Sequence, residues 1–145
     1  MYFTTLLTTA ALFLSTPNRP DAVKVGVKPE TFKPKEPADI SGYYACRGTE
    51  GSGKNYSGVA VISKKNDVYV VQWVVGVGAA FFGVGIRDGD TLACSWALPG
   101  DKGVVRGANL YRIETGRLVG RWTALPGDGR IRTETLTFLK KLDEE

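Results

Sequence analysis

The sequence predicts an all-β protein, an antiparallel up-and-down meander of about eight strands that closes into a small barrel, either round or flattened. Three observations support this prediction. The 145-residue chain contains 18 Gly, 3 Trp, 6 Tyr and 6 Phe, a glycine and aromatic content that is typical of hairpin-rich proteins. Apolar and polar residues alternate in short runs separated by turn residues, as in half-buried strands. In addition, one motif of a tight turn followed by a strand occurs three times.

The repeated motif places a tryptophan four residues after a tyrosine or leucine that follows a turn. It occurs at residues 66–73, 89–96 and 115–122. The last two copies continue into Ala-Leu-Pro-Gly-Asp, at 97–101 and 124–128. An internal repeat of about 23 to 26 residues therefore indicates that a two-strand unit has been copied.

Alternation and turn residues together define the strands. They are expected at about 42–48, 56–63, 68–75, 79–87, 91–97, 104–113, 117–123 and 131–140. Asn, Asp and Gly, which tolerate the positive φ of tight turns, form every second connection. Because the chain meanders, these tight turns all lie at one end of the barrel. The longer, glycine-rich loops are expected at the other end, at 48–55, 76–78, 98–103 and 125–130.

The chain divides into a short N-terminal region, a spacer and one folded domain. Residues 1–16 hold an apolar run too short to span a membrane, which indicates a signal peptide, with an uncleaved hydrophobic anchor as the alternative. Residues 17–39 are rich in Pro, Lys and Glu, which predicts a flexible linker. The barrel domain is expected at 40–142, before an acidic tail at 143–145. We therefore expect an exported protein, periplasmic, cell-surface or secreted, that meets a membrane only through an uncleaved N-terminus.

The chain contains no histidine, which excludes Ser-His-Asp and Cys-His catalysis and histidine-ligated zinc. Segment 48–54 resembles a phosphate-binding loop, but it joins two strands and Asn55 follows its lysine. Glu134 is the one carboxylate within a predicted strand. Its parity is inward, while its place near the start of the strand favours a solvated position. We expect no catalytic residue, no metal and no cofactor, and a carboxylate-dependent enzyme is the minor alternative.

Trp73, Trp96 and Trp122 have equivalent places on strands that run in the same direction, so they are expected to point inward at one level near the long loops. With Tyr69 they form a candidate ligand pocket, in which aromatic side chains bind an apolar or sugar-like group. The favoured interpretation is nevertheless that the three indoles plug a narrow barrel, as large side chains do in small eight-stranded barrels. A cavity that touches all three rings would distinguish the pocket from the plug.

Cys46 and Cys94 are the only cysteines. In an exported chain such a pair suggests a disulfide. Both have inward parity on the first and fifth strands, which lie opposite each other in a round barrel, so a disulfide requires a flattened one. The alternative is two buried free thiols that pack as small hydrophobic groups.

The predicted barrel domain is basic, with 14 Lys and Arg against 8 Asp and Glu. Its outward-facing candidates for an anionic-partner patch, on neighbouring strands, are Arg106, Arg112, Arg117 and Arg121. Envelope polysaccharide, lipid headgroups or an acidic protein surface suit such a patch, and a solvated charged face is the alternative. Nucleic acid is not an expected partner, because basic residues are not interleaved with exposed aromatic residues.

Short segments along the domain carry a family resemblance. They include Gly42-Tyr-Tyr, Tyr69-x-x-x-Trp73, Leu118-Val-Gly-Arg-Trp122 and Thr133-Glu-Thr-Leu-Thr137. These segments resemble a family of small exported bacterial proteins, mostly uncharacterised, some of which carry a fibronectin-binding label; no functional residue carries over. The architecture is similar to avidin-type and lipocalin-type barrels by analogy alone. The main functional expectation is a non-enzymatic exported binding or cell-envelope interaction domain, and the alternative is a small-molecule-binding barrel.

Overall fold

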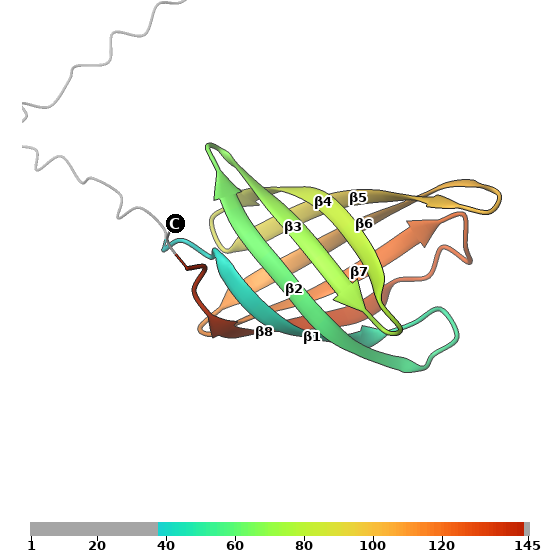
Figure 1. Ribbon diagram of the computed structural model, residues 1–145, viewed down its shortest axis with the longest axis horizontal. Helices are drawn as coiled ribbons and strands as arrows, with labels where there is room; N and C mark the ends of the chain where they lie inside the picture. The colour runs from blue at the N-terminus through green and yellow to red at the C-terminus, as the bar shows by residue number, and fades with distance from the viewer. Residues whose placement is uncertain (1–37, 144–145) are drawn as a thin grey trace, which may run out of the picture. The chain divides into compact units, whose positions relative to one another are not determined.

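The computed structural model describes residues 38–143, which form one closed barrel of antiparallel strands (Figure 1). The strands are β1 (Gly42–Thr49), β2 (Asn55–Lys65), β3 (Val68–Val75), β4 (Ala79–Asp88), β5 (Thr91–Gly100), β6 (Gly103–Glu114), β7 (Arg117–Leu125) and β8 (Arg132–Lys140). Each strand pairs with its neighbours in sequence, and β1 pairs with β8 to close the ring. The predicted eight-stranded meander is confirmed.

Several predicted segments lie outside the described residues. These are the signal peptide at 1–16, the linker apart from Ala38 and Asp39, and the last two residues of the acidic tail. Between residues 38 and 143, no helix has the length and apolar character needed to cross a bilayer.

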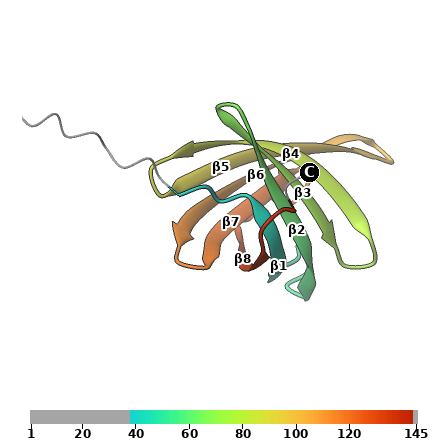
Figure 2. The ribbon, with the colours of Figure 1, turned by 60° about the vertical axis from the view of Figure 1, so that its left-hand side comes forward.

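The two ends of the barrel differ in their connections (Figure 2). Tight turns join β2 to β3, β4 to β5 and β6 to β7, with Asn66, Gly89 and Gly116 at φ angles of 54°, 55° and 73°. We call this the tight-turn end. The remaining connections lie at the opposite end, which we call the loop end.

One connection at the loop end differs from the prediction. The sequence suggested a loop at 98–103, whereas β5 and β6 continue until Gly100 pairs with Gly103. Gly103 adopts a φ of 118°, a conformation open to glycine, and a two-residue turn therefore closes the hairpin. The β5–β6 hairpin extends beyond the neighbouring strands (Figure 1).

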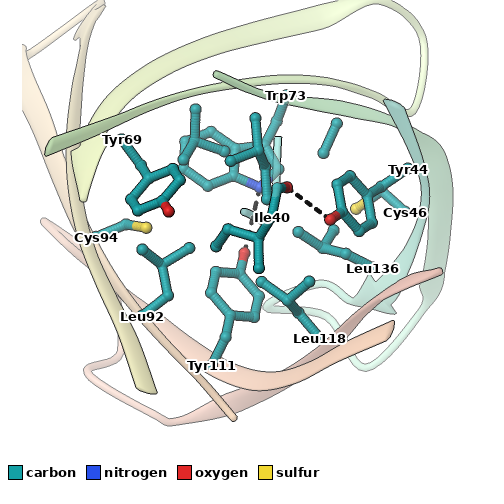
Figure 3. Close-up of a cluster of buried hydrophobic side chains, with 13 residues drawn as sticks. Ile40, Tyr44, Cys46, Tyr69, Trp73, Leu92, Cys94, Tyr111, Leu118 and Leu136 are labelled. Carbon is teal, nitrogen blue, oxygen red and sulfur yellow. Dashed lines mark hydrogen bonds between the residues drawn. The ribbon is translucent and has the colours of Figure 1, made fainter. Parts of the chain in front are cut away.

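The hydrophobic core fills the part of the barrel near the tight-turn end. Its largest fully buried side chains are those of Tyr111, Ile62, Leu92, Leu118, Leu136, Val71 and Cys46. Ile40, just before β1, lies in the centre of the ring (Figure 3), and its carbonyl accepts a 2.7 Å hydrogen bond from the Tyr44 hydroxyl. The segment before β1 thus covers the tight-turn end, and the open space in the barrel lies at the loop end.

Candidate functional site

A cavity of about 390 Å³ opens at the loop end. Its wall is aromatic and consists of Tyr56, Trp73, Phe81, Trp96 and Trp122. Aliphatic residues surround the mouth, among them Val75, Val77, Leu98 and Val105. The buried polar residues Asn109 and Glu134 form the floor. A volume of this size falls within the range of small-molecule sites, roughly 300 to 1,000 Å³.

The three tryptophans line this cavity, so the favoured plug interpretation is wrong. Trp73 is buried, while Trp96 and Trp122 are half-buried. Glycines on adjacent strands leave room for the rings: a Cβ at Gly107 would lie 2.0 Å from Cζ2 of Trp96, and a Cβ at Gly83 would lie 3.0 Å from Cζ3 of Trp73. Because the rings pack over glycines at the barrel wall, space is left between them.

Tyr69 does not line the cavity, in contrast to the prediction. It is buried near the tight-turn end, where its hydroxyl donates a 3.4 Å hydrogen bond to Asp39. Four residues along a strand correspond to about 13 Å, so the side chain four positions before Trp73 lies a layer below the cavity. The wall instead includes Tyr56 and Phe81, which the sequence analysis did not select. Tyr56 lies four residues before buried Ala60 on the same strand, so both side chains point inward. The alternation of the sequence alone therefore indicates that Tyr56 faces the interior.

Glu134 is the buried acid of the site, with 4% of its surface exposed. Four side chains donate hydrogen bonds to it. Oε1 accepts from the Tyr111 hydroxyl and, at 3.3 Å, from the Asn109 amide. Oε2 accepts from the Tyr56 hydroxyl at 2.5 Å and from the Cys46 thiol at 3.2 Å. The expectation of a solvated Glu134 is therefore wrong, because donors from three other strands enclose the carboxyl group.

Two glycines make this arrangement possible. Glu134 on β8 pairs with Gly48 on β1 and with Gly120 on β7. On the far side of these glycines, Gly48 pairs with Tyr56 and Gly120 pairs with Tyr111. A Cβ at Gly48 would lie 2.4 Å from the Tyr56 hydroxyl, and a Cβ at Gly120 would lie 2.3 Å from Cδ1 of Tyr111. Each tyrosine thus crosses over a glycine to reach the same carboxyl group, from opposite sides.

The hydrogen bonds fix where the protons of this network lie. The Tyr111 oxygen accepts from Trp73 Nε1 at 3.2 Å and from Asn109 Nδ2 at 2.7 Å. Its single proton therefore points to Glu134. The Asn109 amide is oriented in turn, because its Oδ1 accepts from Trp96 Nε1 at 2.8 Å. Two wall indoles are thus connected to Glu134 through neutral side chains.

Burial and the charge of Glu134 both oppose ionisation of the thiols and phenols around it. Burial, with the Glu134 charge second, raises the pKa of Cys94 to about 12. The pKa values of Cys46, Tyr56 and Tyr111 are raised well above their usual range, again by burial first and by Glu134 second. These groups therefore stay protonated at neutral pH, and the three that contact Glu134 act as hydrogen-bond donors.

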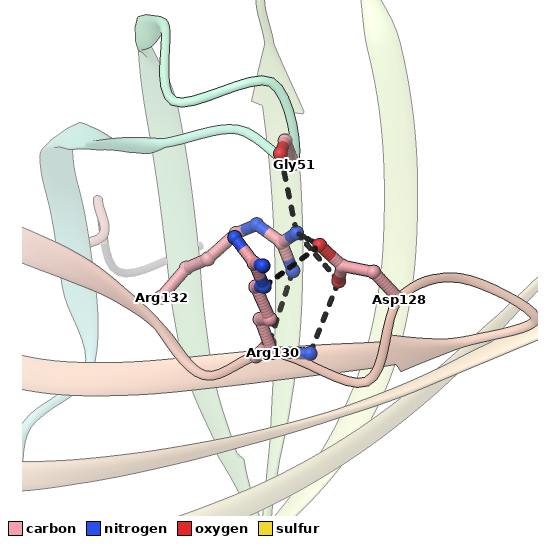
Figure 4. Close-up of polar contacts among 4 residues, drawn as sticks. All are labelled: Gly51, Asp128, Arg130 and Arg132. Atoms are coloured by element: carbon pink, nitrogen blue, oxygen red, sulfur yellow. Dashed lines mark hydrogen bonds and ion pairs between the residues drawn. The ribbon is translucent and has the colours of Figure 1, made fainter.

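Arg132 packs on Trp122 beside the cavity and is not among the residues that line it. Its guanidinium group lies 5.4 Å from the centroid of the Trp122 ring. Figure 4 shows that the same group donates to both carboxylate oxygens of Asp128, at 2.7 Å. The hydrogen bond from Arg132 lowers the pKa of Asp128. A 3.4 Å bond from Arg132 to the Gly51 carbonyl connects the loop after β1 to β8. The positive charge of Arg132 is thus paired with Asp128.

The two cysteines are free, buried thiols. The disulfide alternative is therefore not what the structure contains. Cys46 instead donates to Glu134, and Cys94 packs in the core against the position of Gly85, where a Cβ would lie 2.9 Å from its sulfur.

The predicted arginine patch is exposed but does not form one uniform positive surface. Arg112 and Arg117 both donate to Glu114, at 3.0 and 2.7 Å. Arg106 and Arg121 are exposed on β6 and β7 and form no ion pair within the described part of the chain. Glu114, which lies just beyond the strand predicted at 104–113, is thus the partner of two of the four arginines.

No protein-family model matches the chain, and no curated protein matches its sequence. Among solved structures, the redesigned β-barrel mFAP1 bound to DFHBI is similar, with a TM-score of 0.52 and 18% identity over 68% of this chain and 94% of that chain. A de novo designed fluorescence-activating β-barrel gives a TM-score of 0.48 and 15% identity over 69% of this chain and 94% of that chain. At such identities the likeness establishes the fold alone, a small closed β-barrel.

Proposed function

We propose that this protein is a small-molecule-binding barrel that takes an apolar, ring-containing ligand into the cavity at the loop end. The observation that carries the proposal is an aromatic wall above a polar floor in a cavity of about 390 Å³. Covering exposed apolar surface contributes about 25 cal/mol per Å². Offset or edge-to-face contacts between a ligand ring and the wall rings add to this.

The wall is ordered before a ligand arrives. Trp96 is fixed by its bond to Asn109, Trp73 is fixed by its bond to Tyr111, and Phe81 packs edge-to-face on Trp96 at 5.0 Å. A wall whose side chains already have one orientation loses little conformational entropy on binding. This order favours a binding site over a loosely packed void.

The designed barrel mFAP1 was solved with the small molecule DFHBI bound to it. It supports the proposal in one respect: a barrel of similar architecture has room for a small ligand. The class of ligand proposed for the present chain is inferred from the residues that line its own cavity.

The expected interaction with an anionic envelope component has less support. It depends on the outer arginines, and Glu114 pairs with Arg112 and Arg117. Export itself stays a prediction from residues 1–16, which lie outside the described residues.

A neutral solvatochromic naphthalene dye tests the proposal by fluorescence titration of the full chain. We expect saturable binding with blue-shifted emission. Ala124→Phe fills the cavity from its wall and should weaken binding about tenfold or more. Ala93→Phe makes the same change at an exposed position on β5 and should leave binding unchanged. Absence of binding, or equal binding by both variants, would contradict the proposal.

A further inference from the structure

We propose that the cavity selects ligands that carry a positively charged nitrogen, with Glu134 as the counter-ion. The inference rests on the proposed function and assigns a ligand class to the same site. It follows from the charges of the cavity, from its aromatic wall and from the composition of the network around Glu134.

Two carboxyl groups line the cavity. Glu50 lies at the mouth and Glu134 at the floor, and the lining, within the described residues, includes no Lys or Arg. The predicted domain as a whole is basic. The negative character of the cavity is therefore local and opposite to that of the molecule around it, which is the pattern expected of a site that attracts a cation.

The partners of Glu134 leave its charge in place. All four are neutral donors, two tyrosine hydroxyls, an amide and a thiol. Because the Tyr111 proton already points to Oε1, the carboxyl group acts there as an acceptor and needs no proton of its own. Hydrogen bonds from neutral groups stabilise a buried carboxylate but do not cancel its field, which acts strongly in a cavity with apolar walls. A ligand cation would supply the opposite charge that the fold does not.

The wall suits a cation as well as a ring. Indole is the best aromatic partner for a cation, and all three tryptophans of the chain line the cavity. One of these rings already carries a cation outside the cavity lining, because the Arg132 guanidinium lies 5.4 Å from the centroid of the Trp122 ring. That arginine does not neutralise the floor, since both oxygens of Asp128 hold it at 2.7 Å.

The class of ligand follows from these features. A one-ring or two-ring amine has a size appropriate to about 390 Å³. Its ring would pack on the indoles while its ammonium group approaches Glu134. A carboxylate on the same ring would face the repulsion of Glu134 and Glu50 and should bind worst.

Three ligands with one ring system and three charges provide the test. Naphthalen-2-ylmethylammonium, naphthalen-2-ylmethanol and 2-naphthoate would be titrated into the full chain by isothermal titration calorimetry at neutral pH. We expect the ammonium to bind about tenfold tighter than the alcohol, and the carboxylate to bind weakest. In Glu134→Gln the ammonium and the alcohol should bind within about twofold of each other, whereas Glu50→Gln, the matched change at the mouth, should keep the preference.

The outcomes separate the two proposals. If none of the three ligands binds, the proposed function fails and this inference fails with it. If all three bind equally, the pocket stands and the charge preference is overturned. A preference that survives in Glu134→Gln, or is lost in Glu50→Gln, overturns the role of Glu134. If Glu134→Gln does not fold, the comparison of the wild type with Glu50→Gln decides. In Glu50→Gln, Glu134 is the one acidic group that the described residues still contribute to the lining, so a preference for the ammonium must come from it.

Discussion

The Tyr111 hydroxyl donates its one proton to Glu134 while it accepts hydrogen bonds from Trp73 and Asn109. One phenol thus connects the floor of the cavity to its wall. Tyr111→Phe removes this oxygen without changing the ring, and leaves a buried carboxylate, an indole N–H and an amide N–H each short of a partner.

We expect Tyr111→Phe to lower the free energy of unfolding by about 2 to 4 kcal/mol, measured by urea denaturation. Tyr43→Phe is the matched control, because Tyr43 is only partly buried and its ring contact with Lys140 needs no hydroxyl. Its effect should stay within about 0.5 kcal/mol. Equal stability of the two variants would show that the network does not hold the floor together.

Gly48 and Gly120 allow the two tyrosines to reach Glu134, so alanine at either position should destabilise the barrel. We expect a loss of about 1 to 3 kcal/mol for each, because the added Cβ would lie 2.4 Å from Tyr56 or 2.3 Å from Tyr111. The direction of the change in the free energy of unfolding distinguishes the two cases, since Gly→Ala in a strand otherwise stabilises a protein by about 0.5 to 1 kcal/mol.

Gly51→Ala is the control for these two glycine variants. Its Cβ would meet only the end of the flexible Arg132 side chain, at 3.1 Å. Thermal or chemical denaturation of the three variants provides the comparison. A gain in stability for Gly48→Ala and Gly120→Ala would contradict the crossing of tyrosines over glycines.

The free energy of unfolding should fall as the pH rises from 9 to about 12. Burial raises the pKa of Cys94 from 9.0 to about 12 and that of Tyr44 from 10.0 to about 12. Between these limits the unfolded chain loses protons that the folded chain keeps, so the stabilisation present below pH 9 is lost as the pH approaches 12. Urea denaturation at a series of pH values should show a shallower decline for Cys94→Ala than for the control Ser95→Ala, whose exposed hydroxyl does not titrate in this range. Identical slopes would refute the assignment to Cys94.

Both thiols should resist modification in the folded protein. Cys46 and Cys94 are 1% and 5% exposed, and burial raises the pKa of each thiol, which suppresses the reactive thiolate. A colorimetric disulfide reagent at neutral pH should therefore label neither cysteine in the native chain and both in guanidinium chloride. Intact mass should not change on reduction beforehand; a change would indicate a disulfide and overturn this arrangement.

Much of the fold follows from local pattern. Period-two alternation and turn glycines predicted every strand to within three residues of its bounds, because each half-buried strand must turn one face inward. The largest error, at 98–103, arose where Leu98-Pro-Gly resembles a loop although the ladder continues to Gly100. Parity also placed Trp73, Trp96 and Trp122 on the inner surface at the correct end.

The site itself depends on pairing between strands that are distant in sequence. Parity indicated that Glu134 points inward, yet only the closure of β8 on β1 brings it to Cys46 and Tyr56. The inward parity of Asn109 was equally readable, but its role depends on Glu134 from β8. Whether three indoles fill a barrel or line a cavity depends on the room that glycines such as Gly107 leave beside them. Which glycines lie beside the indoles is decided by the pairing of the strands, and the sequence alone does not specify that pairing.

The central claim is that the tryptophan-lined cavity binds a ligand, and the three indole N–H signals of the chain test it most directly. Each signal belongs to a wall residue, Trp73, Trp96 or Trp122. In a ¹H–¹⁵N spectrum titrated with naphthalen-2-ylmethylammonium, we predict that all three indole signals shift together and saturate, while the amides of exposed Ala93 and Arg112 do not move. Shifts confined to outer-face amides, with the three indole signals unchanged, would contradict the claim.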